Sequence, residues 1–255
     1  MIEAPRLVSD LSRPEDLARR LDREFRRTPL VIVAGPVPRS DALAPWNDLA
    51  MAVGEVDVSG EDSASGRLLD EPSPWSDVRY REDMQHTFRH SCTAQPLHTD
   101  SAYAAVPSDV CFLICEHEGA SGGETIFVDA HTVEDIARRT DRALHEALFT
   151  VAMPYEKAGA RGRVVPILTR GDDGLLINWN YYRVVRDASA EVGEVAERFR
   201  AFLEHEIVGG GHVTPVRLAP GEATVFEDRR VLHGRTAFAP SPRCLWKCSV
   251  TRRAQ

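Results

Sequence analysis

The sequence predicts a mainly β protein, a two-sheet jelly roll with a few helices packed outside it. Short apolar runs typical of strands recur along the chain, separated by glycine, proline and charged residues. Segments with helical spacing are few, and the chain shows no internal repeat. Its 255 residues, 43% of them hydrophobic, are enough for one sizeable core, so we expect a single domain over residues 1–255.

The first quarter of the chain predicts one helix followed by one strand. Residues 12–16 form a helix-start signal, and Leu17, Leu21 and Phe25 follow at helical spacing. The apolar run at residues 30–33 then predicts a short strand, closed by glycine and proline.

Two stretches are candidates for lid or substrate-loop insertions, namely residues 54–90 and parts of residues 155–187. The first stretch lacks apolar periodicity and is rich in serine, glycine, proline and acidic residues. Long irregular segments in a compact domain often cover a functional site. A mobile surface loop is the equal alternative for this stretch.

The remaining elements alternate between short apolar strands and two amphipathic helices. The expected strands are residues 110–114, 126–128, 178–183, 223–226, 231–233 and 243–251. The expected helices are residues 132–149, opened by Thr132 and Asp135, and residues 189–208, ended by the glycine run 209–211.

The charge of the chain argues against nucleic acid or an anionic membrane surface as a partner. The formal net charge is -8 and the sequence pI is about 5.6, so there is no basic footprint. The first residues lack the basic start and apolar stretch of a signal peptide, and no run approaches the ~20 apolar residues of a membrane span. We expect a soluble cytoplasmic protein that acts on a small molecule. The sequence is compatible with a homo-oligomer.

The five cysteines predict no disulfide framework, because their number is odd and the chain reads as intracellular. Two pairs have four-residue spacing, which on strands places both members on one face, so packing is favoured over a structural zinc site. These cysteines are Cys92, Cys111, Cys115, Cys244 and Cys248.

The clearest chemical motif is His98-Thr99-Asp100, which His233 complements far downstream. In an extended segment residues i and i+2 point to one face, so His98 and Asp100 would enter the same cavity. Two histidines and one carboxylate on one side of a metal form the facial arrangement of non-haem Fe(II) oxygenases. The tripeptide alone is weak support, since a histidine after an apolar residue is more often a packed core residue.

The C-terminal strand candidate carries a basic residue that needs an anion. In an extended segment Arg243, Leu245, Lys247 and Ser249 share one face. A guanidinium binds a carboxylate through two parallel hydrogen bonds, so Arg243 suits the distal carboxylate of a dicarboxylic acid.

These motifs resemble the Fe(II)/2-oxoglutarate dioxygenases of the taurine dioxygenase and clavaminate synthase-like superfamily. The resemblance rests on three segments: Pro96-Leu97-His98-Thr99-Asp100, Gly122-Gly123-Glu124-Thr125, and Asp228-Arg229-Arg230-Val231-Leu232-His233-Gly234-Arg235 followed by Arg243. It runs from about residue 90 to the C-terminus. It implies the double-stranded β-helix, cupin-like version of the jelly roll.

Carried over by position, the resemblance implies that His98, Asp100 and His233 hold Fe(II). It implies that Arg243 pairs with the far carboxylate of the co-substrate 2-oxoglutarate, supported by the Thr125 hydroxyl. This chain departs from the family at two points. It has Glu227-Asp228 where the family often has Asp-Asn, and Lys247 where a second Arg is common, which weakens Lys247 as a co-substrate contact.

The resemblance also implies the reaction class. Fe(II), 2-oxoglutarate and O2 would hydroxylate or desaturate a C–H bond and release succinate and CO2. Related halogenases lack the acidic ligand, so Asp100 argues against halogenation. We expect a small polar substrate, such as an amino acid or an intermediate of specialised metabolism.

The substrate contacts are the least defined part of the sequence. Tyr103 lies three residues past Asp100 and is a candidate wall of the cavity. The aromatic and polar segment that follows residue 177 is a candidate for substrate binding; the alternative is that its tyrosines pack in the core and its arginine is solvated. Arg235 could either bind an anionic group of the substrate or stabilise the strand that carries His233. The candidates in these regions are Asn178, Asn180, Tyr182, Arg183 and Arg235.

Two rival functions stay open. A zinc hydrolase uses similar ligands, although hydrolysis needs no dicarboxylate co-substrate and Arg243 therefore argues against it. A non-catalytic cupin-like binding protein would keep the pocket without turnover. The histidines His86 and His90 are spaced like those of a zinc protease helix, but Glu does not follow His86.

Overall fold

In the computed structural model, the described residues are 1–40, 42–61, 68–157, 162–171 and 174–253, and no side chain is described for 59–61 and 68–72. A seven-stranded sheet runs in the order β1-β2-β15-β8-β17-β3, and β6 also pairs with β17. Its strands are β1 (Arg6–Val8), β2 (Leu30–Ala34), β3 (Glu55–Val56), β6 (Ser76–Arg79), β8 (Val110–His117), β15 (Glu222–Glu227) and β17 (Cys244–Thr251).

A four-stranded sheet lies against the first in the order β14-β9-β16-β7. Its strands are β7 (Gln95–His98), β9 (Thr125–Asp129), β14 (Thr214–Val216) and β16 (Val231–Arg235). Apolar side chains from both sheets form one buried cluster, in which Phe127 of β9 meets Phe226 of β15 with ring centroids 5.1 Å apart. The chain is therefore mainly β, with a core between two sheets, as the apolar runs predicted.

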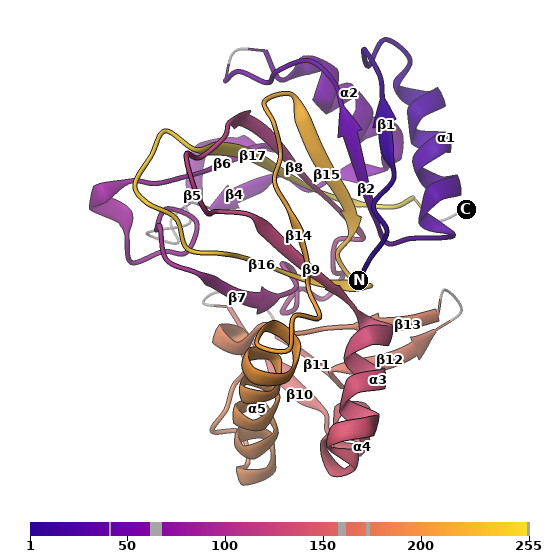
Figure 1. Cartoon of the computed structure of the whole chain (residues 1–255), viewed down its shortest axis with the longest axis vertical. Coiled ribbons are helices and arrows are strands. Elements are labelled where there is room, and N and C mark those ends of the chain that lie inside the picture. The colour runs from indigo at the N-terminus through magenta and orange to yellow at the C-terminus, as the bar shows by residue number, and fades with distance from the viewer. Residues whose placement is uncertain (41, 62–67, 158–161, 172–173, 254–255) are drawn as a thin grey trace.

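Helices cover the outer face of each sheet (Figure 1). Helices α1 (Pro14–Phe25) and α2 (Ala44–Val53) pack on the larger sheet, where Leu21 and Trp46 are fully buried. The helices α3 (Ala130–Thr140), α4 (Arg142–Thr150) and α5 (Ala190–Phe202), with the π-helical turn η3 (Leu203–Val208), pack below the smaller sheet. The alternation of side chains along β9 explains this arrangement. Phe127 points into the core between the two sheets, whereas Ile126 and Val128 point to the opposite face and pack against these helices.

The lower part of the molecule also contains two hairpins, and a third lies in the stretch between β3 and β6. Short 3-10 turns complete the structure. These elements are β10 (Met153–Tyr155) with β11 (Arg163–Val165), β12 (Leu168–Gly171) with β13 (Gly174–Ile177), β4 (Ser59–Glu61) with β5 (Leu68–Ser73), η1 (Glu82–Met84) and η2 (Tyr181–Arg183).

Several expected elements are confirmed and two are wrong. The strands at residues 30–33, 110–114, 126–128, 223–226, 231–233 and 243–251 and the helix from residue 189 are present. The single helix over residues 132–149 is instead two helices, because Asp141 interrupts it and accepts a hydrogen bond from the Leu144 amide as the N-cap of α4. Residues 178–183 are not a strand, since β13 ends at Ile177.

The cysteines form no disulfide, and of the two rival histidines His90 is buried while His86 is exposed. All five cysteines are free thiols, and all except Cys92 are buried. His86 and His90 share no helix, and His90 Nδ1 lies 3.1 Å from the Arg79 carbonyl oxygen. A zinc site of the protease type is therefore not formed by this pair.

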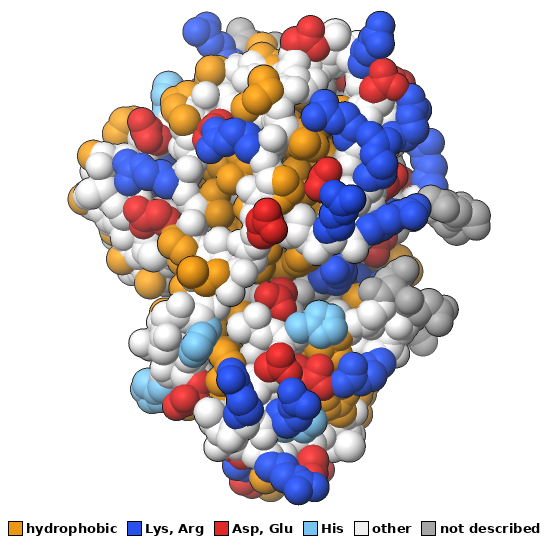
Figure 2. Space-filling model, turned by 45° about the vertical axis from the view of Figure 1, so that its right-hand side comes forward, with side chains coloured by type: hydrophobic (Ala, Val, Ile, Leu, Met, Phe, Trp, Pro, Cys, Tyr) orange, Lys and Arg blue, Asp and Glu red, His pale blue; other side chains and the backbone are white. Residues whose placement is uncertain are grey.

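The surface carries both signs of charge. Figure 2 shows Lys and Arg side chains gathered at the upper right, over the region of α1, with Asp and Glu side chains among them. Within the described residues, no helix combines the length and the apolar character that crossing a membrane requires.

Candidate active site

The pairing of β7 with β16 brings two histidines together. His98 and His233 are direct cross-strand partners in an antiparallel pair, and their ring centroids lie 4.3 Å apart. Directly opposite residues project to the same face of a sheet, so both imidazoles enter the space between the two sheets. His233 belongs to an alternating strand in which Val231 joins the inter-sheet core and Leu232 faces the helices.

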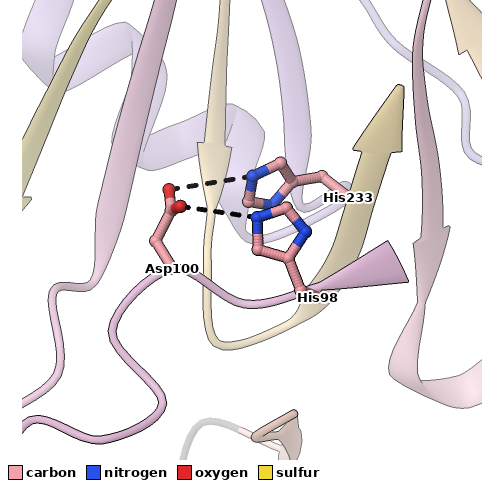
Figure 3. A group of neighbouring side chains, drawn as sticks. All are labelled: His98, Asp100 and His233. Carbon is pink, nitrogen blue, oxygen red and sulfur yellow. Dashed lines mark ion pairs between the residues drawn. The ribbon is translucent and has the colours of Figure 1, made fainter. Parts of the chain in front are cut away.

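Asp100 reaches the same point from the turn that follows β7. The intervening Thr99 points away, because its amide and hydroxyl groups both contact the backbone of Trp179. The Asp100 carboxylate oxygens lie 3.6 Å from His98 Nε2 and 3.7 Å from His233 Nε2 (Figure 3). The three donor atoms lie within 4.8 Å of one another, and no other such group of three exists among the described residues.

The hydrogen bonds of His98 leave a lone pair at its Nε2. His98 Nδ1 lies 2.9 Å from the Pro96 carbonyl, which only accepts, so Nδ1 carries the proton. The Gln95 amide donates to His98 Nε2 at 3.1 Å, in the direction that a metal would take. Burial, reinforced by the nearby His98, lowers the pKa of His233 to about 3, so this imidazole is neutral at physiological pH.

A buried lysine and a second buried acid surround this donor group. Lys247 Nζ lies 2.6 Å from Asp100 Oδ1. Burial alone would raise the pKa of Asp100, but the Lys247 ammonium and the two imidazoles hold it well below its usual range. The Asp228 carboxylate accepts a hydrogen bond from the Asp100 backbone amide and lies 3.6 Å from His233 Nδ1. Burial and the charge of Asp100 raise the pKa of Asp228.

These residues fit a divalent transition-metal ion. Two imidazoles and one carboxylate converge from one side, and the hydrogen bond of His98 Nδ1 to the Pro96 carbonyl orients the His98 ring. His233 Nδ1 is buried without a hydrogen-bond partner among the described residues, at the side of the ring away from Asp100.

The three donors line a cavity of about 650 Å³ that also contains Arg243 and Thr125. Arg243 Nη2 donates to the Gly123 carbonyl at 2.9 Å, while Nη1 is buried with no partner among the described residues. Its guanidinium stacks over the Phe238 ring at 5.2 Å, and burial lowers its pKa. A buried cation with an unsatisfied N–H group has the chemistry of a carboxylate site.

Arg235 also lines this cavity, where it stacks over the Phe238 ring at 5.1 Å and makes its hydrogen bonds to backbone carbonyls. Its Nη2 atom donates to the carbonyl oxygens of Phe88, Ser91 and Thr93 at 2.8–3.1 Å. The side chain therefore ties β16 to the segment before β7. Of the two roles expected for Arg235, these contacts favour the brace.

Of the substrate candidates, only Tyr103 and Arg235 are cavity-lining residues. The Asn178 side-chain amide donates to the Ala102 carbonyl, and the Asn180 side-chain amide donates to the Thr99 carbonyl. Both side chains therefore stabilise the turn at residues 99–102, which carries Asp100 and is called the metal turn below. Tyr182 is 58% exposed and packs on Phe88. Arg183 stacks over the Tyr103 ring at 5.6 Å.

Three residues near the donors were missed by sequence reasoning. Gln95 and Asp57 both line the cavity, and Asp228 lies behind the metal turn. The unusual acid at position 228 was visible as a departure from the family, whereas no spacing or motif singles out Gln95 or Asp57. Their positions depend on strand pairing and loop packing.

The fold and the donor group define a protein of the mononuclear, two-histidine, one-carboxylate metal class. Residues 8–249 match the family described as "Taurine catabolism dioxygenase TauD, TfdA family". The chain belongs to this family.

Individual relatives agree with this assignment. The chain is 29% identical over 153 residues to a trimethyllysine dioxygenase of Meyerozyma guilliermondii, covering 55% of this chain and 38% of that protein. It is 26% identical over 191 residues to a uridine-5'-phosphate dioxygenase of Amycolatopsis sp, covering 69% of this chain and 67% of that protein. The match to the first relative thus spans well under half of that protein's length.

A solved structure shares the fold. An asparagine oxygenase in complex with Fe(II), 2S,3S-3-hydroxyasparagine and succinate superposes with a TM-score of 0.71 at 17% identity. The match covers 92% of this chain and 79% of that one.

Proposed function

We propose that this chain is an Fe(II)- and 2-oxoglutarate-dependent oxygenase. It hydroxylates or desaturates a C–H bond of a small polar substrate, such as an amino acid or an intermediate of specialised metabolism. In the hydroxylation, one oxygen atom of O2 enters the substrate and the other enters succinate, while 2-oxoglutarate loses CO2. The observation that carries this proposal is a single cavity that holds both the donor group and Arg243 with its unsatisfied N–H.

His98, Asp100 and His233 would hold Fe(II), which supplies the O2-dependent oxidation when bound. Arg243 would bind the distal carboxylate of 2-oxoglutarate, and the Thr125 hydroxyl would donate to the same group. Both side chains line the same cavity as the donors.

Lys247 lines the same cavity, and we propose that it acts on Asp100 rather than on the co-substrate. It pairs with Asp100 at 2.6 Å, and its charge offsets the two neighbouring carboxylates. In the proposed enzyme, Lys247 keeps Asp100 ionised and oriented toward the metal.

The finer architecture is part of the same proposal. The two facing sheets would form a double-stranded β-helix of the jelly-roll, cupin-like type within one domain over residues 1–255. The described part of residues 54–90 would cover the substrate, since Val58, Pro74 and Arg89 from this stretch line the cavity, whereas residues 62–67 lie outside the described residues. Parts of residues 155–187 would contribute as well, since Lys157 lines it too, whereas 158–161 and 172–173 lie outside the described residues.

The rival functions differ in what they require of Arg243. A zinc hydrolase has no use for a buried guanidinium with an unsatisfied N–H group beside the metal. A binding protein without turnover would hold 2-oxoglutarate or a similar acid but would release no succinate. Metal content and succinate formation therefore separate the three functions.

The test is an anaerobic titration of the Fe(II)-loaded protein with 2-oxoglutarate. We expect the visible charge-transfer band of a chelated 2-oxo acid, followed by succinate and CO2 once O2 is admitted. His233→Ala should lose the band, whereas His117→Ala, at a 60% exposed side chain outside the cavity, should keep it. Iron-loaded, folded protein without a band would refute the proposal.

A further inference from the structure

The cavity follows one face of β17. Arg243, Leu245, Lys247 and Ser249 are alternate residues, and all four line the cavity. Alternate residues on a strand are about 6.6–6.8 Å apart, so the face from Leu245 to Ser249 spans about 13 Å, and Arg243 lies just before β17, on the far side of the register shift at Cys244. Arg243 lies at one end, Lys247 contacts Asp100 in the middle, and Ser249 lies at the other end.

Asp57 lies at the Ser249 end of this face. Its amide donates to the Ser249 carbonyl at 2.9 Å. The carboxylate accepts hydrogen bonds from Ser108 Oγ at 2.5 Å and from Thr251 Oγ1 at 3.2 Å. Asp57 and Ser108 both line the cavity. The strand thus separates two polar ends, one cationic at Arg243 and one anionic at Asp57.

A short hydrogen-bonded path joins Asp57 to the metal turn. The Ser108 amide donates to Ser101 Oγ at 2.9 Å, and Ser101 directly follows Asp100. A group bound at Asp57 is therefore held at a defined position relative to the donor residues. This is the geometry that positions one C–H bond of a bound molecule.

The charges of the cavity leave Asp57 available to a ligand. Among the described residues that line it, Asp57 and Asp100 are the only carboxylates, and Asp100 is engaged by Lys247. No described Arg, Lys or His side chain lies within ion-pair distance of Asp57. An ionised carboxylate has about four acceptor positions, and the two hydroxyl donors use only part of them.

We propose that Asp57 binds a cationic group of the substrate, either an ammonium or a guanidinium, and that the substrate therefore carries a positively charged nitrogen group. The inference rests on the proposed function, because it places this cation at the end of the cavity opposite the 2-oxoglutarate site. Neutral hydroxyls hold the carboxylate in place, while the cation supplies the missing charge partner.

The test measures binding without turnover. Protein loaded with Zn(II) and N-oxalylglycine is titrated by calorimetry with L-lysine, L-arginine and L-asparagine. The same compounds are then tested with the α-ammonium neutralised by acetylation, and norleucine and citrulline serve as analogues without the side-chain cation. We expect removal of one of the two cations to weaken binding about tenfold or more.

Variants then assign that preference to Asp57. Asp57→Asn keeps an oxygen acceptor for Ser108 and should abolish the difference between the cation and its neutral analogue. Asp57→Glu should retain a preference, and Asp83→Asn, an exposed residue of the same stretch, should leave it unchanged. Thermal melts verify that each variant is folded.

The results separate this inference from the proposed function. Absence of binding by every cation, equal binding of the neutral analogues, or a preference that survives in Asp57→Asn would each overturn the role of Asp57. A charge-transfer band with 2-oxoglutarate in the same preparation would leave the oxygenase assignment intact. Loss of that band with an Asp57-dependent preference would overturn only the oxygenase assignment.

Discussion

Replacing Arg243 with Gln removes the cation at one end of the cavity while keeping a polar side chain. In the native chain, Nη2 of the guanidinium donates to the Gly123 carbonyl at 2.9 Å, and Nη1 is buried without a hydrogen-bond partner among the described residues. Only 5% of the residue is exposed, so water screens its charge weakly. The affinity for 2-oxoglutarate should therefore fall sharply in Arg243→Gln.

The magnitude follows from the burial of this pair. Truncating one partner of a buried, hydrogen-bonded charge pair costs about 2–5 kcal/mol. Lys247 and Arg235 line the same cavity and still attract a dianion, which favours the lower part of that range. At about 2–3.4 kcal/mol, the Kd for 2-oxoglutarate should rise about 30- to 300-fold.

The assay is the anaerobic titration of Fe(II)-loaded protein with 2-oxoglutarate, read from its charge-transfer band. Arg243→Lys is the matched control, and it should give an intermediate affinity because it keeps the charge but loses the bidentate geometry. Iron affinity and melting temperature should stay close to wild type. A Kd within about threefold of wild type in Arg243→Gln would refute this role for Arg243.

Three further substitutions test the surrounding structure. Gly123→Ala should destabilise the protein by about 1–2 kcal/mol in denaturant unfolding, because a residue with φ of +75° is strained without glycine. It should also weaken 2-oxoglutarate binding, since the new Cβ would lie 2.9 Å from Arg243 Nε, and unchanged affinity would show that Arg243 adjusts freely. Asp228→Ala should weaken Co(II) binding by about 10- to 100-fold in calorimetry, because Asp228 holds the Asp100 amide and faces His233 Nδ1; wild-type affinity would contradict this positioning role. Asp100→Ala should lose iron and succinate formation together, and stoichiometric iron in the folded variant would exclude Asp100 as a ligand.

The strands were predictable where local sequence and tertiary environment agree. Residues 110–114 and 223–226 are apolar runs that become central strands buried on both faces. The helix boundaries were missed in two places. Asp129, and not Thr132 with Asp135, caps α3. Asp141 lies inside a stretch that reads as one helix, but its carboxylate accepts from the Leu144 amide and pairs with Arg198 of α5.

The segment after β13 shows how tertiary contacts override local preference. Its aromatic residues favour a strand, but its backbone groups bond to Thr99, beside Asp100, and to Ile167, before β12, instead of forming a strand ladder. The Trp179 carbonyl accepts the Thr99 amide, and the Asn178 amide group of the backbone donates to Ile167. No local pattern in residues 178–183 encodes these partners.

The candidate site divides in the same way. The sequence indicated His98, Asp100 and His233 because i, i+2 spacing and donor chemistry are local properties. The direct pairing of His98 with His233 depends on the register of β7 against β16, which the sequence does not reveal. The position of Asp57 depends on a loop that packs beside β17, so it carried no sequence signal.

The alternation of side chains along β17 places the contacts to Asp100 and Asp57 on one face of the strand. This strand is held between β8 and β6 over Cys244–Lys247, so its register is fixed from both sides. A slip of one residue would turn Lys247 away from Asp100 and the Thr251 hydroxyl away from Asp57, because the side-chain period is two. The β8–β17 register shifts between Cys244 and Leu245, one residue after Arg243, and such irregularities re-aim the side chains near them. The strand can therefore orient Arg243 independently while the rest of its face keeps the strict alternation that the metal turn and Asp57 require.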